Sequence, residues 1–217
     1  MSYTEYNDLF KDTTEEGDSM TSKGFTLIEL AVVLSIIAVL AAVLTPMVTG
    51  YIDQARVARA QADLRTISDA IKLYNRDTGR YPIYDNSTDY TNDAVPVGNT
   101  KLEIGTGTGN TPQPGSGWAL GTTLATSSLE SYMNADRSGV GTAAFPKAGF
   151  RGPYVTSVDT DPWSNKYVLN AGNLRRSSTN HAYVISAGPN GLLETNRDVA
   201  ATATLTPSGD DLIGVIK

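Results

Sequence analysis

The stretch Gly24–Val48, GFTLIELAVVLSIIAVLAAVLTPMV, is an apolar run with one carboxylate, Glu29, close to its start. No charged residue stands between Glu29 and Asp53. As an α-helix, residues 30–50 would span roughly 31 Å, which matches a bilayer core of about 30 Å. A buried helix of a soluble domain is the alternative, but such helices rarely run this far without a charge. The run therefore predicts a helix that crosses a membrane.

Glu29 is the residue in this run that needs an explanation. An ionised side chain in a bilayer costs on the order of 2.5–3.5 kcal/mol on insertion scales. Snorkelling towards the headgroups is one way to avoid this cost, since Glu29 lies near the end of the run. A cation at the same depth is another, but the run contains none. A cut after Gly24 would create such a cation, the new α-amino group of Phe25.

The segment Lys23–Glu29, KGFTLIE, resembles the prepilin cleavage motif of type IV pilins and type II secretion pseudopilins. The resemblance implies that a prepilin peptidase cuts after Gly24 and that the new terminus, Phe25, is methylated. It also implies that Glu29 faces the amino terminus of a neighbouring subunit during filament assembly. Residues 1–24 would then be a cleaved leader, although its acidic first part is atypical and translation starting at Met20 would remove it.

A cut at this place keeps the hydrophobic helix on the mature protein, whereas an ordinary secretory signal is cut behind its apolar segment. We therefore expect residues 25–50 to form a transmembrane and assembly helix. The expected orientation is single-pass in the inner membrane, with the N-terminus cytoplasmic, since Lys23 is a positive charge on that side. The C-terminal domain would be periplasmic.

The helical pattern continues beyond the membrane segment, into residues 51–78. Apolar residues recur there at spacings of three and four, which predicts one buried face; they are Val57, Ala60, Leu64, Ile67, Ile71 and Tyr74. Coiled-coil pairing could use such a stripe, but covering by the chain's own C-terminal sheet is the prediction. We expect one helix from Phe25 to about Asp77.

Pro46 lies inside this helix and has no N–H to offer the carbonyl of Ala42. A kink of this kind is tolerated in many membrane helices. The alternative is a segment that loses helicity when subunits enter a filament. The family resemblance favours that alternative, because members share a proline at the corresponding place.

Residues 79–217 are expected to form the globular domain. Gly79 and Pro82 end the helix, and residues 83–117 have the composition of a loop with little burial. A short helix is expected within 118–133, with weak markers at Leu120, Leu124 and Leu129.

Short antiparallel strands are expected around residues 152–155, 161–167 and 181–186. Trp163, Tyr167 and Tyr183 are expected to be core aromatics. The fold class is α+β: a pilin-like fold in which the long N-terminal helix packs on a small antiparallel β-sheet.

The order GPYV, DPWSNKY and AYVISAGPNG resembles the C-terminal half of the major type II secretion pseudopilin. This resemblance implies a calcium ion in the loop Ala187–Asp211, where it would replace the disulfide of many pilins. The chain has no cysteine to form one. The expected ligands are Asp210 and Asp211, with Asn190 and Ser208, while Glu194, Asp198 and main-chain carbonyls are further candidates. Asn190 stands where aspartate is expected, residues 196–207 resemble an insertion, and a solvated acidic loop is the alternative.

Charge and motif content give no support for two other classes of function, nucleic-acid binding and catalysis. A net charge of −6 gives no basic footprint for nucleic acid. The only histidine, His181, and the absence of phosphate-loop, metal-helix or nucleophile motifs give no support for an enzyme. A membrane-anchored periplasmic enzyme or binding domain would explain the anchor, but not a carboxylate five residues after a cleavable glycine.

The resemblance implies a homo-oligomeric filament subunit, specifically the major pseudopilin that drives folded proteins out through a secretion channel. The alternative is a type IV pilin for adhesion, twitching motility or DNA uptake. The implied partners are the prepilin peptidase, an inner-membrane assembly platform, minor pseudopilins and membrane lipid.

Overall fold

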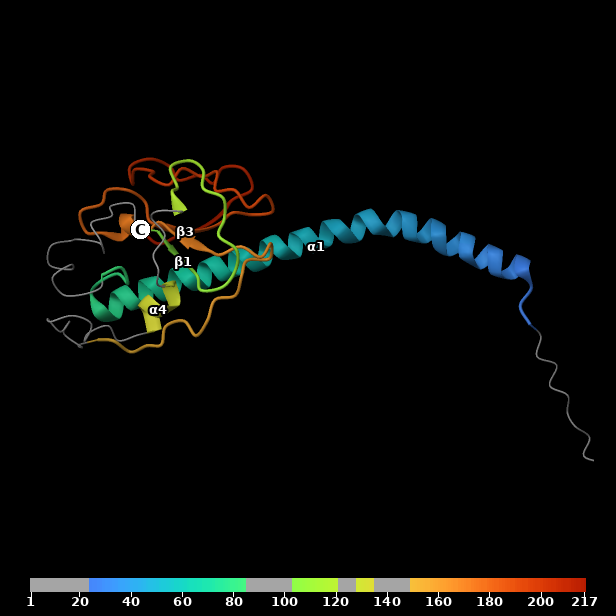
Figure 1. The fold of residues 1–217 in the computed structure, drawn as a ribbon, viewed down its shortest axis with the longest axis horizontal. Coiled ribbons are helices and arrows are strands. Elements are labelled where there is room, and N and C mark those ends of the chain that lie inside the picture. Colours follow the sequence, from blue (N-terminus) through green and yellow to red (C-terminus); the bar gives the residue numbers. More distant parts are fainter. Residues whose placement is uncertain (1–23, 85–102, 121–127, 135–148) are drawn as a thin grey trace, which may run out of the picture. The chain divides into compact units, whose positions relative to one another are not determined.

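The computed structural model of the chain describes residues 24–84, 103–120, 128–134 and 149–217. Contacts within the chain divide it into two compact units, Met1–Thr49 and Gly50–Lys217. The helix α1, Leu27–Thr78, supplies residues to both units, and Figure 1 shows its course. The predicted long helix is therefore confirmed. It begins at Leu27 instead of Phe25 and ends at Thr78 instead of Asp77.

A glycine ends α1, as the sequence predicts. Gly79 has a φ of 73°, a left-handed conformation that suits glycine. Its N–H donates to the carbonyl of Asn75 at 2.8 Å, and the Thr78 hydroxyl donates to the carbonyl of Tyr74 at 2.7 Å. These bonds occupy carbonyls that lose their helical partners at a C-terminus.

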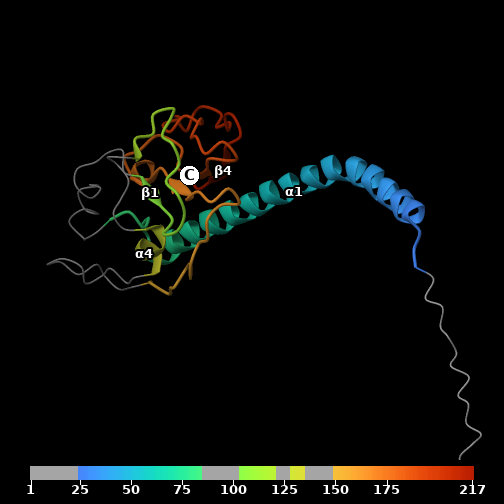
Figure 2. The same ribbon diagram turned by 45° about the vertical axis from the view of Figure 1, so that its right-hand side comes forward.

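Four short strands form one antiparallel sheet in the second unit. They are β1 (Ile104–Gly105), β2 (Val168–Leu169), β3 (Tyr183–Ser186) and β4 (Leu212–Val215). The order across the sheet is β1-β2-β3-β4, so β1 and β4 are its edges (Figure 2). The α+β, pilin-like architecture expected from the sequence is confirmed.

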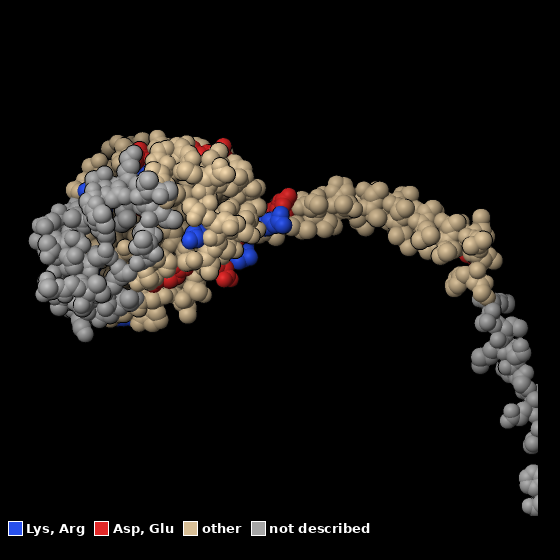
Figure 3. Space-filling view, in the orientation of Figure 1, with Lys and Arg blue, Asp and Glu red and all other residues tan. Residues whose placement is uncertain are grey.

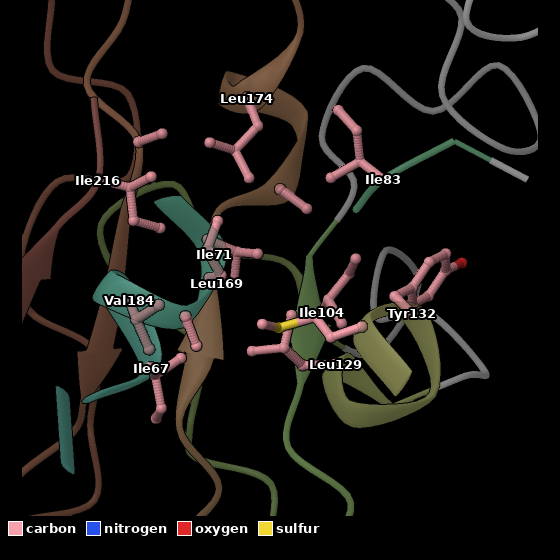
Figure 4. Close-up of a cluster of buried hydrophobic side chains, with 14 of the residues drawn as sticks. Ile67, Ile71, Ile83, Ile104, Leu129, Tyr132, Leu169, Leu174, Val184 and Ile216 are labelled. Carbon is pink, nitrogen blue, oxygen red and sulfur yellow. The ribbon is translucent and has the colours of Figure 1, made fainter. Parts of the chain in front are cut away.

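Both faces of this sheet are buried, and the strand alternation assigns each residue to one face. Ile67 and Ile71 of α1 pack against Leu169 and Val184 on the first face (Figure 4). On the second face, Val168, Tyr183 and Ile185 pack with Trp118 and Leu193. The long helix therefore covers one face, and irregular segments cover the other.

Two short helices also belong to the described part of this unit. α4 (Leu129–Asn134) packs Leu129, Tyr132 and Met133 into the first cluster. The 3₁₀ helix η4 (Ala171–Leu174) follows β2 and is fully buried. The short helix expected within 118–133 is thus found at its C-terminal end, while Leu124 lies outside the described residues.

Strand β4 approaches α1 closely at Gly214. A Cβ at this position would lie 2.5 Å from the Ser68 hydroxyl and 2.7 Å from the carbonyl oxygen of Leu64. Such distances are shorter than side-chain contacts normally allow, and the carbonyl belongs to a helix that cannot yield. Glycine is therefore required for β4 to lie against α1.

The segment DPWSNKY is a turn rather than the strand we predicted. Asp161 Oδ1 accepts the main-chain N–H groups of Trp163 at 3.0 Å and Asn165 at 2.7 Å. A side chain that binds the backbone two and four residues on holds a turn and competes with strand pairing. Asp161 is itself buried, and its Oδ2 accepts the Ser186 hydroxyl of β3 at 2.7 Å.

Three further expectations need correction. Residues 152–155 do not form a strand. Trp163 is only half-buried, whereas Tyr167 and Tyr183 are buried as predicted. The region 83–117 is not uniformly exposed, because Ile104 is fully buried in β1. Pairing with β2 overrides the loop composition at that point.

Candidate functional site

Gly24 and Phe25, the predicted processing residues, precede α1 in extended chain without regular structure. The side chain of Phe25 is 90% exposed, and no atom lies within 4 Å of a Cβ built on Gly24. A peptidase that reads extended chain would find this segment open. The cut itself stays a prediction.

Glu29 forms a capping box with Thr26 at the start of α1. Its Oε2 accepts the Thr26 N–H at 2.8 Å and the Thr26 hydroxyl at 2.9 Å. In return, the Thr26 Oγ1 accepts the Glu29 N–H at 3.3 Å. The pattern T-x-x-E before an apolar run is the sequence signature of this box, so Thr26 could have been recognised from the sequence and was missed.

The geometry of the capping box leaves Glu29 with unused capacity. The hydrogen bonds that its carboxylate accepts all use Oε2, and no Lys or Arg among the described residues pairs with it. A carboxylate can accept further bonds through its second oxygen. Glu29 is thus held at the start of the helix with Oε1 able to receive a cation from another chain.

The first half of α1 exposes an apolar surface. Every residue from Gly24 to Arg56 is exposed, including Leu34, Ile36 and Val43. Figure 3 shows this half almost entirely in the colour of uncharged residues. Among the described residues, α1 is the one helix long and apolar enough to cross a membrane.

Helix α1 runs on through Pro46. The Thr45 hydroxyl donates to the carbonyl of Ala41 at 2.7 Å, and the Thr49 hydroxyl donates to the carbonyl of Pro46 at 2.9 Å. Both hydroxyls are thereby satisfied within the helix itself, as polar side chains in an apolar medium need to be. Neither bond reaches the Ala42 carbonyl, which Pro46 deprives of an N–H donor. The predicted loss of helicity in a filament stays a prediction.

A second candidate site lies in the acidic loop that follows β3. The N–H of Asn190 donates to Asp210 Oδ2 at 3.0 Å, and the side-chain amide of Asn190 donates to Glu194 Oε2 at 3.0 Å. Asp211 Oδ2 accepts the N–H groups of Glu194 at 2.8 Å and Thr195 at 2.6 Å. The loop therefore brings three carboxylates into one network.

Glycines permit this close approach. Gly209 and Gly188 both have a φ of 61°. A Cβ at Gly209 would overlap the Glu194 carboxylate, and one at Gly188 would overlap the main chain of Asp210. Gly188 and Gly209 therefore leave space beside the carboxylates, and a larger side chain at either position would fill that space.

Two carboxylate oxygens in the loop lack partners. Asp210 Oδ1 and Asp211 Oδ1 are buried without a hydrogen bond. Burial also raises the pKa of Asp211 above its ordinary value, although the N–H donors of Thr195 and Glu194 oppose the shift. Buried oxygens without donors are costly unless a ligand completes them.

The predicted calcium ligands are only partly brought together. Asp210, Asp211 and Asn190 share the network, and Glu194 joins them. Ser208 is exposed and contacts the loop through its main chain, where its carbonyl accepts the Asp211 N–H at 3.3 Å. No group of three or more Asp, Glu, His or Cys side chains in the described ranges has the arrangement of a metal site. Any cation here would need amide and main-chain oxygens besides the carboxylates.

Asp198, a further candidate, lies outside this network because Arg197 holds it. Arg197 Nη1 donates to Asp198 Oδ1 at 2.6 Å, and Arg197 Nε donates to Glu103 Oε1 at 3.0 Å. Both Arg197 and Glu103 are buried. This ion pair joins the segment that begins at Asn196 to the residue before β1, and no local sequence pattern predicted it.

Comparisons with known proteins point to the same family as the sequence motifs do. Residues 19–45 match the prokaryotic N-terminal methylation motif, and residues 47–94 match the family "Type II secretion system (T2SS), protein G". The first match includes Gly24, Phe25 and Glu29. No solved structure matches the chain significantly.

Curated relatives carry the same family name, type II secretion system core protein G. The protein of Pseudomonas aeruginosa is 44% identical over 59 residues, which are 27% of this chain and 42% of that protein. The protein of Escherichia coli K12 is 28% identical over 179 residues, 82% of this chain and 88% of that protein. The Klebsiella pneumoniae protein is 24% identical over 177 residues, 82% of this chain and 91% of that protein.

The motif, the apolar helix and the helix-on-sheet fold together define a type IV pilin-like protein. Within that class, the family match and the relatives support the major pseudopilin, the core protein G type. The family resemblance is confirmed, and the segment KGFTLIE lies within the matched residues 19–45. This is a family of structural pseudopilins rather than of enzymes.

Proposed function

We propose that the chain is the repeating subunit of a type II secretion pseudopilus, a filament that drives folded proteins across the outer membrane. The observation that carries this proposal is the first half of α1, apolar and exposed throughout, with one carboxylate, Glu29, at its start. An apolar helix of this kind can lie in lipid and can also pack against copies of itself. One surface therefore serves the stored subunit and the filament.

The assembly step follows from charge. Cleavage after Gly24 places a cationic amino group on Phe25, at the depth of Glu29. In an apolar bundle the amine of one subunit and the Glu29 Oε1 of its neighbour would attract strongly, because the local dielectric is low. Thr26 holds the carboxylate through its other oxygen. An unpaired Glu29 would be costly there, so a correctly registered neighbour is favoured.

The subunit's partners follow from the same scheme. A prepilin peptidase would process Gly24–Phe25, and an inner-membrane platform with minor pseudopilins would start the filament. The globular unit would face the periplasm, with the N-terminus cytoplasmic.

We also propose a calcium ion in the acidic loop. Calcium prefers six to eight oxygen ligands at sites that combine carboxylates with carbonyls. Asp210 and Asp211 would supply the partnerless Oδ1 atoms, with Asn190, Ser208 and main-chain oxygens as further ligands. When bound, the ion would neutralise the carboxylates and join the loop after β3 to the segment before β4.

Filament formation tests the main proposal. We expect Glu29→Leu and Glu29→Gln to abolish filaments while leaving the globular unit folded, and Asp69→Asn, an exposed acid outside the apolar run, to assemble normally. Electron microscopy of secretion-competent cells and sequencing of the mature N-terminus are the measurements. Efficient filaments from Glu29→Gln would overturn the proposed pairing.

Calorimetry of the full chain in detergent micelles tests the calcium site. We expect saturable heat and a higher melting temperature with calcium, both lost in Asp211→Asn and kept in Asp69→Asn. An unchanged melting temperature in the parent protein at millimolar calcium would remove the site from the proposal.

A further inference from the structure

A polar pocket lies away from both sites described above. It has a volume of about 310 Å³ and lies between the loop 175–180, which follows η4, and Arg197–Asp198 of the insertion. Every side chain that lines it is polar or charged, including Arg175, Ser178 and Thr179. A pocket without apolar lining favours a small charged ligand over a hydrophobic one.

The loop that forms the pocket is fixed from several sides. Lys217 Nζ donates to the carbonyls of Arg175 at 3.1 Å and Ser178 at 2.9 Å. The N–H of Ala201 donates to the carbonyl of Thr179 at 2.8 Å. A fixed loop loses little conformational entropy when it binds a ligand.

Several hydrogen-bond donors in the pocket lining have no acceptor among the described residues. Arg175 uses its Nε to bind the carbonyl of Gly172 at 3.1 Å, which leaves its two terminal nitrogens unused among the described residues. The Ser178 Oγ accepts the Asn180 N–H at 3.3 Å and keeps its own proton to donate. The Thr179 hydroxyl and the Asn180 side-chain amide have no hydrogen-bond partner within the described ranges.

The acidic residue in the pocket lining, Asp198, is paired through one of its oxygens. Asp198 Oδ1 accepts both Arg197 Nη1 at 2.6 Å and Asn173 Nδ2 at 3.1 Å. Arg197 is balanced in turn by Glu103. The positive charge of Arg175 is the one in the pocket lining that no described carboxylate pairs with, although the whole chain carries −6.

We propose that this pocket binds an oxyanion, a carboxylate or a phosphate group. Arg175 supplies the charge and a forked pair of donors suited to planar or tetrahedral oxyanions. Ser178, Thr179 and Asn180 supply neutral donors around it. The ligand could come from an acidic polypeptide segment or from free phosphate, and the two sources share this chemistry.

Titration of the full chain in nonionic detergent micelles tests the pocket. The probes are sodium phosphate and, separately, the peptide acetyl-Glu-Asp-Glu-amide, with EDTA present so that the acidic loop holds no calcium. We expect saturable binding by calorimetry that weakens with added sodium chloride. Binding of phosphate indicates a free-anion site, whereas binding of the peptide alone indicates a polypeptide carboxylate.

Three variants make the result specific. Arg175→Gln should weaken binding at least tenfold, and Thr179→Val should weaken it by several fold. Arg65→Gln, which changes an exposed arginine of α1 outside the pocket, should bind as the parent does. Thr179→Val keeps the test valid if the melting temperature shows that Arg175→Gln does not fold. The proposal is overturned if neither probe binds the parent saturably, or if a folded Arg175 or Thr179 variant binds as tightly as the parent.

Discussion

The two halves of α1 are built from similar apolar residues but lie in opposite environments. In the first half, Leu34 and Ile36 are more than half exposed, at 57% and 54%. In the second half, Leu64 and Ile71 are buried at 1% and 0% exposure. In the proposed function, lipid or another subunit covers the first half. The chain's own sheet covers the second half. The packing that stabilises the globular unit should therefore come from the second half.

The largest effect should come from shortening a covered side chain. Ile71→Ala should lower the free energy of unfolding by about 2–5 kcal/mol, because it leaves a cavity between α1 and the sheet. Ile36→Ala should change it by less than about 0.5 kcal/mol. Urea unfolding in detergent micelles, followed by tryptophan fluorescence, measures both. Equal effects would break the comparison.

A second test uses glycines in place of large residues. Gly214→Ala should destabilise the unit by about 1–3 kcal/mol, because its Cβ would press on α1. Gly50→Ala meets nothing within 4 Å and should stabilise the helix by up to about 1 kcal/mol. The two variants should therefore shift the melting temperature in opposite directions. A stable Gly214→Ala protein would mean that β4 does not lie against α1 as described.

A hydrogen bond between α1 and Tyr167, the residue before β2, should give a smaller effect. The Tyr167 hydroxyl donates to Asp63 Oδ2 at 2.9 Å, and burial raises the pKa of Tyr167, so it keeps its proton at neutral pH. Tyr167→Phe should cost about 0.5–1.5 kcal/mol. Tyr51→Phe, on an exposed residue, is the matched control for the same denaturation curve. A neutral Tyr167→Phe variant would show that this contact adds nothing to the packing.

The smallest effect should be a pH dependence at Asp161. Burial raises the pKa of this carboxyl, although its hydrogen bonds from Ser186 and the turn oppose the shift. Folding thus favours the protonated form. The contribution is complete below the unfolded pKa of about 3.9 and is lost as the pH rises through the folded-state pKa.

Asp161→Asn has no such proton to lose and keeps an acceptor oxygen for the turn. Its stability relative to the parent should therefore improve as the pH is raised from acid to neutral in EDTA. Parallel curves for the two proteins would show that Asp161 titrates alike in the folded and unfolded states.

How well the sequence predicts each region depends on how far apart along the chain the interacting residues lie. The anchor helix, its end at Gly79 and the capping box at Thr26 depend on residues a few positions apart, so patterns alone can reveal them. The strand predicted at residues 181–186 is confirmed as β3, Tyr183–Ser186. In contrast, β1 and β2 have two residues each and exist only through pairing, so local patterns cannot reveal them. Trp163 and its neighbours have strand-like side chains, but the carboxylate of Asp161 holds them in a turn.

The acidic loop illustrates the same limit. Asp210 and Asp211 were predicted as calcium ligands from the order of the segments along the chain. The fold places both in the hydrogen-bond network of the acidic loop. Asp198 was also a candidate, and only the fold shows that Arg197 holds it away. The pair Arg197–Glu103 joins residues 94 positions apart, and no short-range pattern can report such a contact.

The contact between Gly214 and α1 has a consequence for biogenesis. The stripe on the second half of α1 is synthesised well before β4, which follows it along the chain. At about 5–20 residues per second, the ribosome needs roughly 7–30 s to pass from one to the other. During that interval the stripe lacks its complete cover, so the nascent chain needs shielding until β4 has been synthesised.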